Sequence, residues 1–585
     1  MIIKVCKQCY RVIAINLTAQ NSGKYKKSVC LTGNLPELYN RMVVNFELHY
    51  DNVTDYEIKL TDKNKAILEK NGVDTDEYER ALRIHKELKT EKVDWYIYKS
   101  EPGKLYRFLE FGKADRLHKV IYNNATDKAR LNEINRLILK KSRFKHTPQF
   151  SMDEYLKMYE DIEANGAYEK LPVSLKIAGL SNKKYGISKG MVYDSELVTK
   201  QKYITANIEE RVRRQFPLLR KYQIYDFLEK LDKTGKAEEQ LNVLDCLTDS
   251  GPCIITGKAG TGKTTVIKLV IDCYANYYGQ ANILLITPTG KASRRLAEKT
   301  GMPASTIHRA LRKKPDDDFV YYNRNNPLPH KVVIIDESSM IDTLLMYDLL
   351  NAVHPMSKII FAGDHNQLPP VGCGEPFFDF LKTLPVNELK ENHRQAEDTE
   401  ILDVANGILE GKGIYPAKGV NVTQIPYNEL EKAADYYSSA FEENSYQIIS
   451  PYNALNELIN NHLKKGSFRF NVGDKIIMLR NTKEYCNGDI GYIKSITTDD
   501  GSDGITSFRS KFHMQIDIEG NVVNLTEEQY GDLELAYAIT VHKMQGSECD
   551  NIVVVTPKSE KCISNVKLMY TAATRARKEL DFVLL

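Results

Sequence analysis

The sequence has little that would hold it in a membrane or carry it out of the cell. Its longest apolar runs, within residues 331–335 and 551–555, are far shorter than the roughly 18 residues that a membrane-spanning helix needs. Charge appears at Lys4, too early for the apolar core of a signal peptide. We therefore expect a soluble cytoplasmic protein with no membrane partner.

Cysteine is scarce as well. The 10 cysteines among 585 residues are too scattered for a disulfide-stabilised scaffold. Cys6 and Cys9 form one Cys-x-x-Cys pair, to which Cys30 could add a third zinc ligand, but no fourth ligand lies nearby in the sequence. We favour two reduced cysteines at the start of a strand, with zinc binding as the alternative.

An excess of one charge is also lacking, because 81 basic and 78 acidic residues leave a net charge of +3. Any nucleic-acid-binding surface must therefore be a local groove rather than a general cationic coat. Residues 128–147 form one basic segment with apolar residues at helical spacing. It could follow phosphates, but a solvated charged face on a packing helix is the favoured interpretation.

The length suggests about four domains. Alternating apolar and polar residues predict an antiparallel β unit in residues 1–60, and helical patterns follow over residues 61–235. Farther along, continuous apolar strands alternate with helical segments, which predicts an α/β fold with parallel sheets covered on both faces. The expected strands form two sets: residues 253–257, 283–288, 332–336 and 358–363, then 447–450, 536–540, 552–556 and 580–585.

The strongest chemical signal is the glycine-rich loop GKAGTGKT at residues 257–264, which follows an expected strand and opens an expected helix. Its glycines let successive backbone N–H groups turn toward an anion, and the helix N-terminus adds positive potential. Lys263 can reach the β- and γ-phosphates of ATP, and the Thr264 hydroxyl can bind Mg²⁺. The predicted nucleotide-binding residues of this segment are Gly257, Gly260, Gly262, Lys263, Thr264 and Thr265.

Polar residues end two further strands. Asp336 stands at the carboxyl end of its strand, where a Mg²⁺ shell needs a carboxylate. Glu337 follows it and can polarise the water that attacks the γ-phosphate. Gln367, in the loop after the fourth strand, could hydrogen-bond the γ-phosphate or that water, with a polar loop ended by prolines as the alternative.

Two arginines can stabilise the charge that develops in phosphoryl transfer, namely Arg394 and Arg575. Arg575 and Arg577 would lie about 200° apart if both were on one helix, so they cannot share a face. Arg575 follows the small pair Ala572 and Ala573, which suits close packing against another domain. We therefore assign Arg575 to the site and Arg577 to the surface.

As a set and in this order, these residues resemble the motifs of superfamily 1 helicases, most closely the RecD-like and Dda-like branch 1B. The resemblance covers about residues 240–585 and extends to segments 287–292, 305–308 and 540–548. It implies that Gln240 reads the adenine and that Glu548 contacts the nucleotide. The DNA-contacting residues that it implies are Thr287, Pro288, Lys291, Thr306, His308, Thr540 and His542.

The resemblance also implies a domain plan. The predicted parts are an OB-like β domain (1–60), a helical N-terminal region (61–235), a first RecA-like domain (236–395) with a β-hairpin pin near 311–330, a second RecA-like domain (396–470 and 531–585) and an inserted SH3-like barrel (471–530). Phe319, Tyr321 and Tyr322 of the pin could stack on a terminal base pair, or pack within a turn. No glycine-rich helix-hairpin-helix repeat marks residues 61–235, which are assigned by position alone.

The sequence thus predicts a helicase that uses ATP and Mg²⁺, moves 5′ to 3′ on single-stranded DNA and unwinds duplex at single-strand/double-strand junctions, in replication, recombination or repair. Single-strand-binding, replication or recombination proteins are the expected partners. The alternatives are a motor subunit of a nuclease-helicase complex, a nucleotide-switched DNA clamp, and an RNA substrate.

Overall fold

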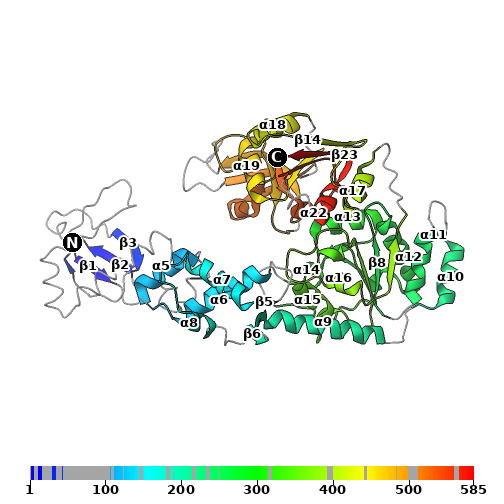
Figure 1. Cartoon of the computed structure of the whole chain (residues 1–585), viewed down its shortest axis with the longest axis horizontal. Helices are drawn as coiled ribbons and strands as arrows, with labels where there is room; N and C mark the ends of the chain where they lie inside the picture. Colours follow the sequence, from blue (N-terminus) through cyan, green and yellow to red (C-terminus); the bar gives the residue numbers. More distant parts are fainter. Residues whose placement is uncertain are drawn as a thin grey trace. The chain divides into compact units, whose positions relative to one another are not determined.

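The protein is described by a computed structural model (Figure 1). The described residues are 2–5, 11–15, 29–34, 42–43, 106, 111–122, 124–143, 149–178, 185–188, 190–213, 219–231, 238–248, 251–313, 319–391, 399–440, 445–482, 484–498, 512–518, 520–558 and 565–585. They form two compact units, Met1–Glu196 and Leu197–Leu585, each of which we describe by itself.

The first unit opens with an antiparallel sheet, as predicted for residues 1–60. The strand order is β3-β2-β1-β4, and the strands are β1 (Ile2–Val5), β2 (Arg11–Ile15), β3 (Val29–Asn34) and β4 (Met42–Val43). The OB-like assignment stays a prediction. Cys6 and Cys9 lie outside the described residues, so the zinc alternative is not addressed.

Helices follow in the same unit, namely α5 (Phe111–Tyr122), α6 (Lys128–Arg143), α7 (Met152–Glu163) and α8 (Val173–Ala178). The prediction of a wholly helical region is wrong in one respect, because a three-stranded antiparallel sheet lies among them. Its strand order is β5-β7-β6, from β5 (Gln149–Ser151), β6 (Tyr185–Ser188) and β7 (Met191–Asp194). Strands of three or four residues are too short to show a period of two.

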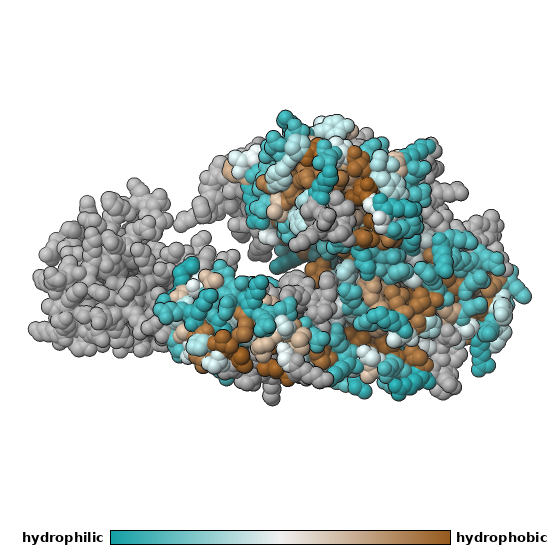
Figure 2. All heavy atoms as spheres, in the orientation of Figure 1, coloured by the Kyte–Doolittle hydropathy of each residue, from teal (hydrophilic) through white to brown (hydrophobic). Residues whose placement is uncertain are grey.

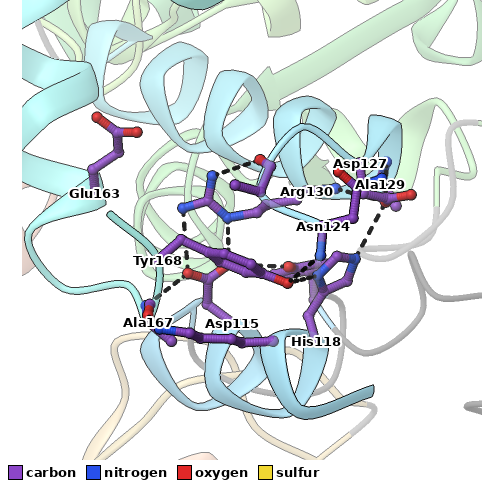
Figure 3. A network of polar contacts seen from close by, with 12 residues as sticks. Asp115, His118, Asn124, Asp127, Ala129, Arg130, Glu163, Ala167 and Tyr168 are labelled. Carbon is purple, nitrogen blue, oxygen red and sulfur yellow. Dashed lines mark hydrogen bonds and ion pairs between the residues drawn. The ribbon is translucent and has the colours of Figure 1, made fainter. Parts of the chain in front are cut away.

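The basic segment is a packing helix. Ile134 and Ile138 of α6 are fully buried in a cluster with residues of α7. Arg130 is buried too: its guanidinium Nε donates to Asp115 Oδ1 at 2.7 Å and its face covers the ring of Tyr168 (Figure 3). Asp115 also accepts from the backbone N–H of Ala167 at 2.8 Å. The network therefore ties α5, α6 and the loop after α7 together.

The second unit contains a six-stranded parallel sheet of order β10-β9-β11-β12-β8-β13. Its strands are β8 (Cys253–Gly257), β9 (Ile283–Thr287), β10 (Ala304–Thr306), β11 (Val332–Ile335), β12 (Lys358–Gly363) and β13 (Val386–Leu389). Alternate strand residues enter two apolar clusters. One cluster contains α12 (Lys263–Tyr278), and the other contains α9 (Ser195–Arg213), α15 (Thr343–Ala352) and α16 (Pro376–Phe380).

A five-stranded parallel sheet of order β14-β23-β22-β15-β21 forms the second domain of this unit. Its strands are β14 (Val420–Gln424), β15 (Tyr446–Ser450), β21 (Ala538–Thr540), β22 (Cys549–Thr556) and β23 (Ala576–Leu584). One apolar cluster joins it to α17 (Ile401–Leu409) and α22 (Val566–Ala573), and another to α18 (Leu430–Ala440) and α19 (Asn453–Leu463). The predicted pair of parallel sheets covered on both faces is confirmed.

Between β15 and β21 in the sequence lies an antiparallel sheet with its own apolar cluster, of order β19-β18-β17-β16-β20. Its strands are β16 (Lys475–Met478), β17 (Ile490–Thr498), β18 (Phe512–Ile518), β19 (Asn521–Thr526) and β20 (Leu533–Leu535). The SH3-like assignment and the domain boundaries stay predictions. Within the described parts no helix is both long and apolar enough to cross a membrane. Hydrophilic and hydrophobic residues intermingle on the face shown in Figure 2.

Candidate functional site

The glycine-rich loop lies where the sequence predicts it, between β8 and α12. Gly260 and Gly262 have φ values of 86° and 80°, a left-handed conformation that favours glycine. A Cβ on Gly257 would lie 2.6 Å from Thr261 Oγ1, so this position needs glycine because of a close approach. Lys263 Nζ donates to the carbonyl oxygens of Gly257 and Lys258 at 2.5 and 2.8 Å. The ammonium therefore already lies over the loop, with Thr264 half-buried and Thr265 exposed beside it.

The acidic pair follows β11 directly. The Glu337 backbone N–H donates to Asp336 Oδ1 at 2.9 Å, and Glu337 itself has a φ of 53°, unusual for a residue with a side chain. Burial and the Glu337 carboxylate raise the pKa of Asp336 to about 7, although the charges of Lys263 and Arg295 oppose that rise. The Asp336 carboxyl is therefore costly to ionise without a nearby positive charge. Such a group suits a site that receives a cation.

Two buried glutamines carry amide oxygens that accept no hydrogen bond from the residues that the structure describes. They are Gln240, on α11 (Glu238–Asn242), and Gln367, in the loop after β12; each is 4% exposed. A buried carbonyl oxygen without a donor is costly. Both side chains therefore have an unused acceptor, which the adenine amino group could satisfy at Gln240 and the attacking water at Gln367.

The second parallel sheet contributes α22 to the same region, a feature that the sequence analysis missed. The hydroxyl of Tyr570 accepts from the backbone N–H of Ala259, in the glycine-rich loop, at 3.0 Å. It donates to Asp364 Oδ2, beyond β12, at 2.8 Å. The next residue, Thr571, accepts from the Leu368 N–H at 3.0 Å. The only signal in the sequence was that Tyr570 opens the segment that contains Arg575.

The two arginines after α22 do not lie on one helix, and the helical argument that separated them is wrong. The helix ends at Ala573, and Arg577 belongs to β23, where it pairs with Asp550 at 2.8 Å. Arg575 is 3% exposed and donates to the carbonyl oxygens of Thr571 and Ser547. In this conformation its guanidinium is occupied within the second domain, and its role toward phosphate stays a prediction. Arg394 lies outside the described residues.

Glu548, predicted to contact the nucleotide, is bound by an arginine of the first domain. Arg295, on α13 (Gly290–Thr300), lies 2.6 Å from Glu548 Oε1. The neighbouring Arg294 pairs with Asp489 at 3.0 Å. Two successive arginines of α13 thus pair with residues that follow the first parallel sheet in the sequence. Arg295 is a further residue that sequence reasoning did not single out.

Four of the predicted DNA-contacting residues lie at or just after the ends of edge strands: Thr306, His308, Thr540 and His542. Thr306 ends β10 and caps α14 (Ile307–Ala310), accepting from the Arg309 N–H at 3.2 Å. Thr540 ends β21 and caps α20 (Val541–Met544), accepting from the Lys543 N–H at 3.2 Å. The same Thr-x-His turn therefore ends one edge strand of each parallel sheet. Each turn leaves its histidine, His308 or His542, exposed.

The remaining residues predicted to contact DNA come from the end of β9. The side chain of Thr287 is buried and donates to the carbonyl oxygen of Thr289 at 2.8 Å, so it shapes the turn. Pro288 and Lys291 are half-buried at the surface of the same turn. Only the latter two have exposed surface that a strand could touch.

The aromatic residues of the predicted pin divide into two kinds. Tyr322 packs against the core beside α15, as in the turn-packing alternative, whereas Phe319 and Tyr321 are 63% and 43% exposed. The guanidinium of Arg312 lies 4.8 Å from the centre of the Tyr321 ring. Among the described residues of 311–330 the strand pairing consists of two isolated bridges, Asn323 with Asn326 and Leu328 with Val353, so the pin stays a prediction.

Two segments of the chain match known protein families. Residues 240–373 match the family described as AAA domain, and residues 535–583 match that described as UvrD-like helicase C-terminal domain. The ATP-dependent RecD2 DNA helicase of Deinococcus radiodurans is 34% identical over 367 residues, 60% of this chain and 49% of that protein. This chain therefore spans about half the length of that relative.

A protein named RecBCD enzyme subunit RecD, from Mycolicibacterium smegmatis, is 28% identical over 408 residues, 59% of this chain and 70% of that protein. Among solved structures, a Pif1 helicase from Bacteroides in complex with ADP-AlF3 and single-stranded DNA is 21% identical, covers 59% of this chain and 92% of that one, and has a TM-score of 0.36. Two segments of this chain thus match helicase-type domain families, and the chain is similar over about 60% of its length to proteins named RecD2 and RecD.

Proposed function

We propose that the protein is an ATP-dependent DNA helicase that moves 5′ to 3′ on single-stranded DNA. The observation that carries this proposal is the convergence of the glycine-rich loop, the acidic pair and Gln367 at the carboxyl ends of β8, β11 and β12. Helix α22 of the second sheet bonds to the glycine-rich loop and to the loop that carries Gln367. A site shared by two domains can change shape when its ligand is cleaved.

The nucleotide would lie along this edge of the first sheet. In our proposal Gln240 receives the amino group of adenine, because its buried amide oxygen is otherwise unsatisfied. The N–H groups of the loop and the Lys263 ammonium hold the phosphates. Gln367 accepts from the attacking water through its amide oxygen, or donates to the γ-phosphate through its amide N–H group.

The donor set fits Mg²⁺, a hard cation that prefers oxygen ligands. Thr264 and Asp336 would hold it, and when bound it would offset charge on the phosphate oxygens. Glu337, which follows Asp336 and has a left-handed backbone, accepts the proton of the attacking water. Arg575 and Arg394 would supply charge from the second domain, which for Arg575 requires its present carbonyl contacts to break.

The strand would pass over the two Thr-x-His turns. Because each turn belongs to a different parallel sheet, a change in the distance between sheets moves one contact relative to the other. Repeated cycles of ATP binding and hydrolysis would then advance the protein along the backbone, and Phe319 and Tyr321 would meet the duplex.

The experiment that tests this proposal measures ATP hydrolysis with and without single-stranded DNA. We expect DNA to raise the turnover rate strongly and many ATP molecules to be hydrolysed per protein. One slow turnover per binding event would instead indicate a nucleotide-switched clamp. Stimulation by RNA alone would overturn the choice of DNA.

A role as the motor subunit of a nuclease-helicase complex is the second candidate, favoured by the relatives named RecBCD enzyme subunit RecD. It requires a partner for duplex unwinding, whereas the first candidate does not. ATP hydrolysis stimulated by DNA, with no strand displacement by the protein alone, would favour it.

A further inference from the structure

One side chain, that of Tyr570, connects the second parallel sheet with two loops of the first. Tyr570 is 1% exposed, and its ring belongs to the apolar cluster of the second parallel sheet. Its hydroxyl leaves that cluster, accepts from the Ala259 N–H in the glycine-rich loop and donates to Asp364. The ring is therefore fixed in one domain while the hydroxyl is bonded to two loops of the other.

The chemistry of the hydroxyl suits this position. Burial and the Asp364 carboxylate raise the pKa of Tyr570 well above its ordinary value, so the phenol keeps its proton. A neutral phenol donates to the carboxylate and accepts from the backbone N–H at the same time. A phenylalanine ring would fill the same space but would leave both partners unsatisfied.

Asp364 extends the connection to Gln367. The carboxylate of Asp364 is fully buried and its Oδ1 accepts from the Asn366 N–H at 2.9 Å. Its backbone carbonyl accepts from the Gln367 N–H at 3.2 Å. With Thr571 bonded to Leu368, α22 holds both ends of the loop that carries Gln367.

We propose that Tyr570 is a positioning residue that couples nucleotide occupancy of the glycine-rich loop to the position of α22, and so to the affinity for DNA. A phosphate in the loop competes with the hydroxyl for the Ala259 N–H, since a charged acceptor is stronger than a neutral one. Nucleotide therefore changes the strength of the α22 contact. By linkage, that contact changes the affinity for nucleotide by the same factor.

The inference rests on the proposed function, because the second sheet carries the Thr540 and His542 turn of the DNA path. The test measures the dissociation constant of a fluorescent oligothymidine without nucleotide and with Mg²⁺ and a non-hydrolysable ATP analogue. The ratio of the two constants reports the coupling. A residue that only stabilises the fold would lower the melting temperature without changing this ratio.

We expect Tyr570→Phe to bring the wild-type ratio about five- to tenfold closer to one, as expected for loss of a hydrogen bond to a charged group. Asp364→Asn should change the ratio in the same direction, and it tests the connection if Tyr570→Phe does not fold. Tyr274→Phe is the matched control, because Tyr274 is fully buried and its hydroxyl has no partner in the described part of the chain.

The outcomes separate the two proposals. A wild-type protein whose DNA affinity ignores nucleotide would contradict the proposed function and this coupling together. A wild-type ratio that Tyr570→Phe and Asp364→Asn both leave unchanged would overturn the coupling alone.

Discussion

At the scale of single residues, Lys263 carries the clearest prediction. Its ammonium lies on the carbonyl oxygens of the glycine-rich loop, where a phosphate would replace them as its partner. We expect Lys263→Ala to lower the rate of ATP hydrolysis at least ~100-fold, the usual cost of losing one preorganised donor. DNA binding without nucleotide should change little. Lys268→Ala, an exposed lysine of the same helix, is the control, and retained hydrolysis in Lys263→Ala would refute the phosphate assignment.

The position of Gln240 predicts that the site prefers ATP to GTP. Its unsatisfied amide oxygen can accept a hydrogen bond from the amino group of adenine, which guanine does not offer at the same position. Gln240→Ala should therefore raise KM for ATP about tenfold while changing KM for GTP much less, as expected for one lost hydrogen bond. The exposed Gln280→Ala should leave both values alone. An equal change for the two nucleotides would argue against adenine contact.

The burial of His118 predicts that the stability of the first unit depends on pH. Burial lowers its pKa in the fold, although Asp127 at 3.3 Å opposes the shift (Figure 3). As pH falls through about 6.5, the unfolded chain takes up a proton that the folded unit resists, so stability is lost on the acid side. For one proton the slope is at most ~1.4 kcal/mol per pH unit.

The measurement for His118 is hydrogen exchange of amides in α5 and α6 of the full chain at pH 7.5 and 5.5, corrected for intrinsic rates. We expect faster opening at pH 5.5 in the wild type and a smaller change in His118→Gln. The same pH response in both proteins would rule out His118 as its source.

At the scale of elements, one buried arginine of α9 adds hydrogen bonds to the apolar packing between α9 and α15. Arg211 is buried, and its guanidinium donates to the carbonyl oxygens of Val353 at 2.8 Å and His354 at 3.1 Å, just beyond the end of α15. Arg211→Ala should lower the free energy of unfolding by about 2–4 kcal/mol, because buried acceptors lose their donors. Arg211→Lys should recover only part, since lysine lacks the planar fork.

Arg213 is the control for that prediction. It lies on the same helix with an exposed side chain and pairs with Glu209 at 3.1 Å. Arg213→Ala should lower the free energy of unfolding, measured with denaturant, by less than about 0.5 kcal/mol. Equal effects at the two positions would show that Arg211 does not anchor α9.

Elements whose signals are local could be predicted from the sequence. The four strands of the first set have contiguous apolar residues, and the loops after them hold Lys263, Asp336 and Gln367. The sheet of β5, β6 and β7 was missed because its strands are too short to show a period. Tyr570 was missed because its partner Ala259 lies 311 positions away, and the helical reading of Arg575 and Arg577 failed where α22 ends at Ala573.

At the scale of the whole molecule, two parallel sheets share one site and each carries a Thr-x-His turn. If these turns hold one strand, His308→Ala and His542→Ala should each weaken DNA binding about three- to tenfold, roughly the effect of losing one polar contact. The dissociation constant for ATP, measured without DNA, should change by less than about twofold in either variant, because neither histidine is assigned to the nucleotide. A loss confined to one of the two variants would contradict a path across both sheets.

Strand displacement on partial duplexes tests the central claim most directly. The substrates carry a single-stranded tail at either the 5′ or the 3′ end, and the reactions contain the full chain, Mg²⁺ and ATP. We predict displacement from the 5′-tailed duplex alone, abolished by Lys263→Ala. Displacement from the 3′-tailed duplex alone, or displacement that does not need ATP, would contradict the account.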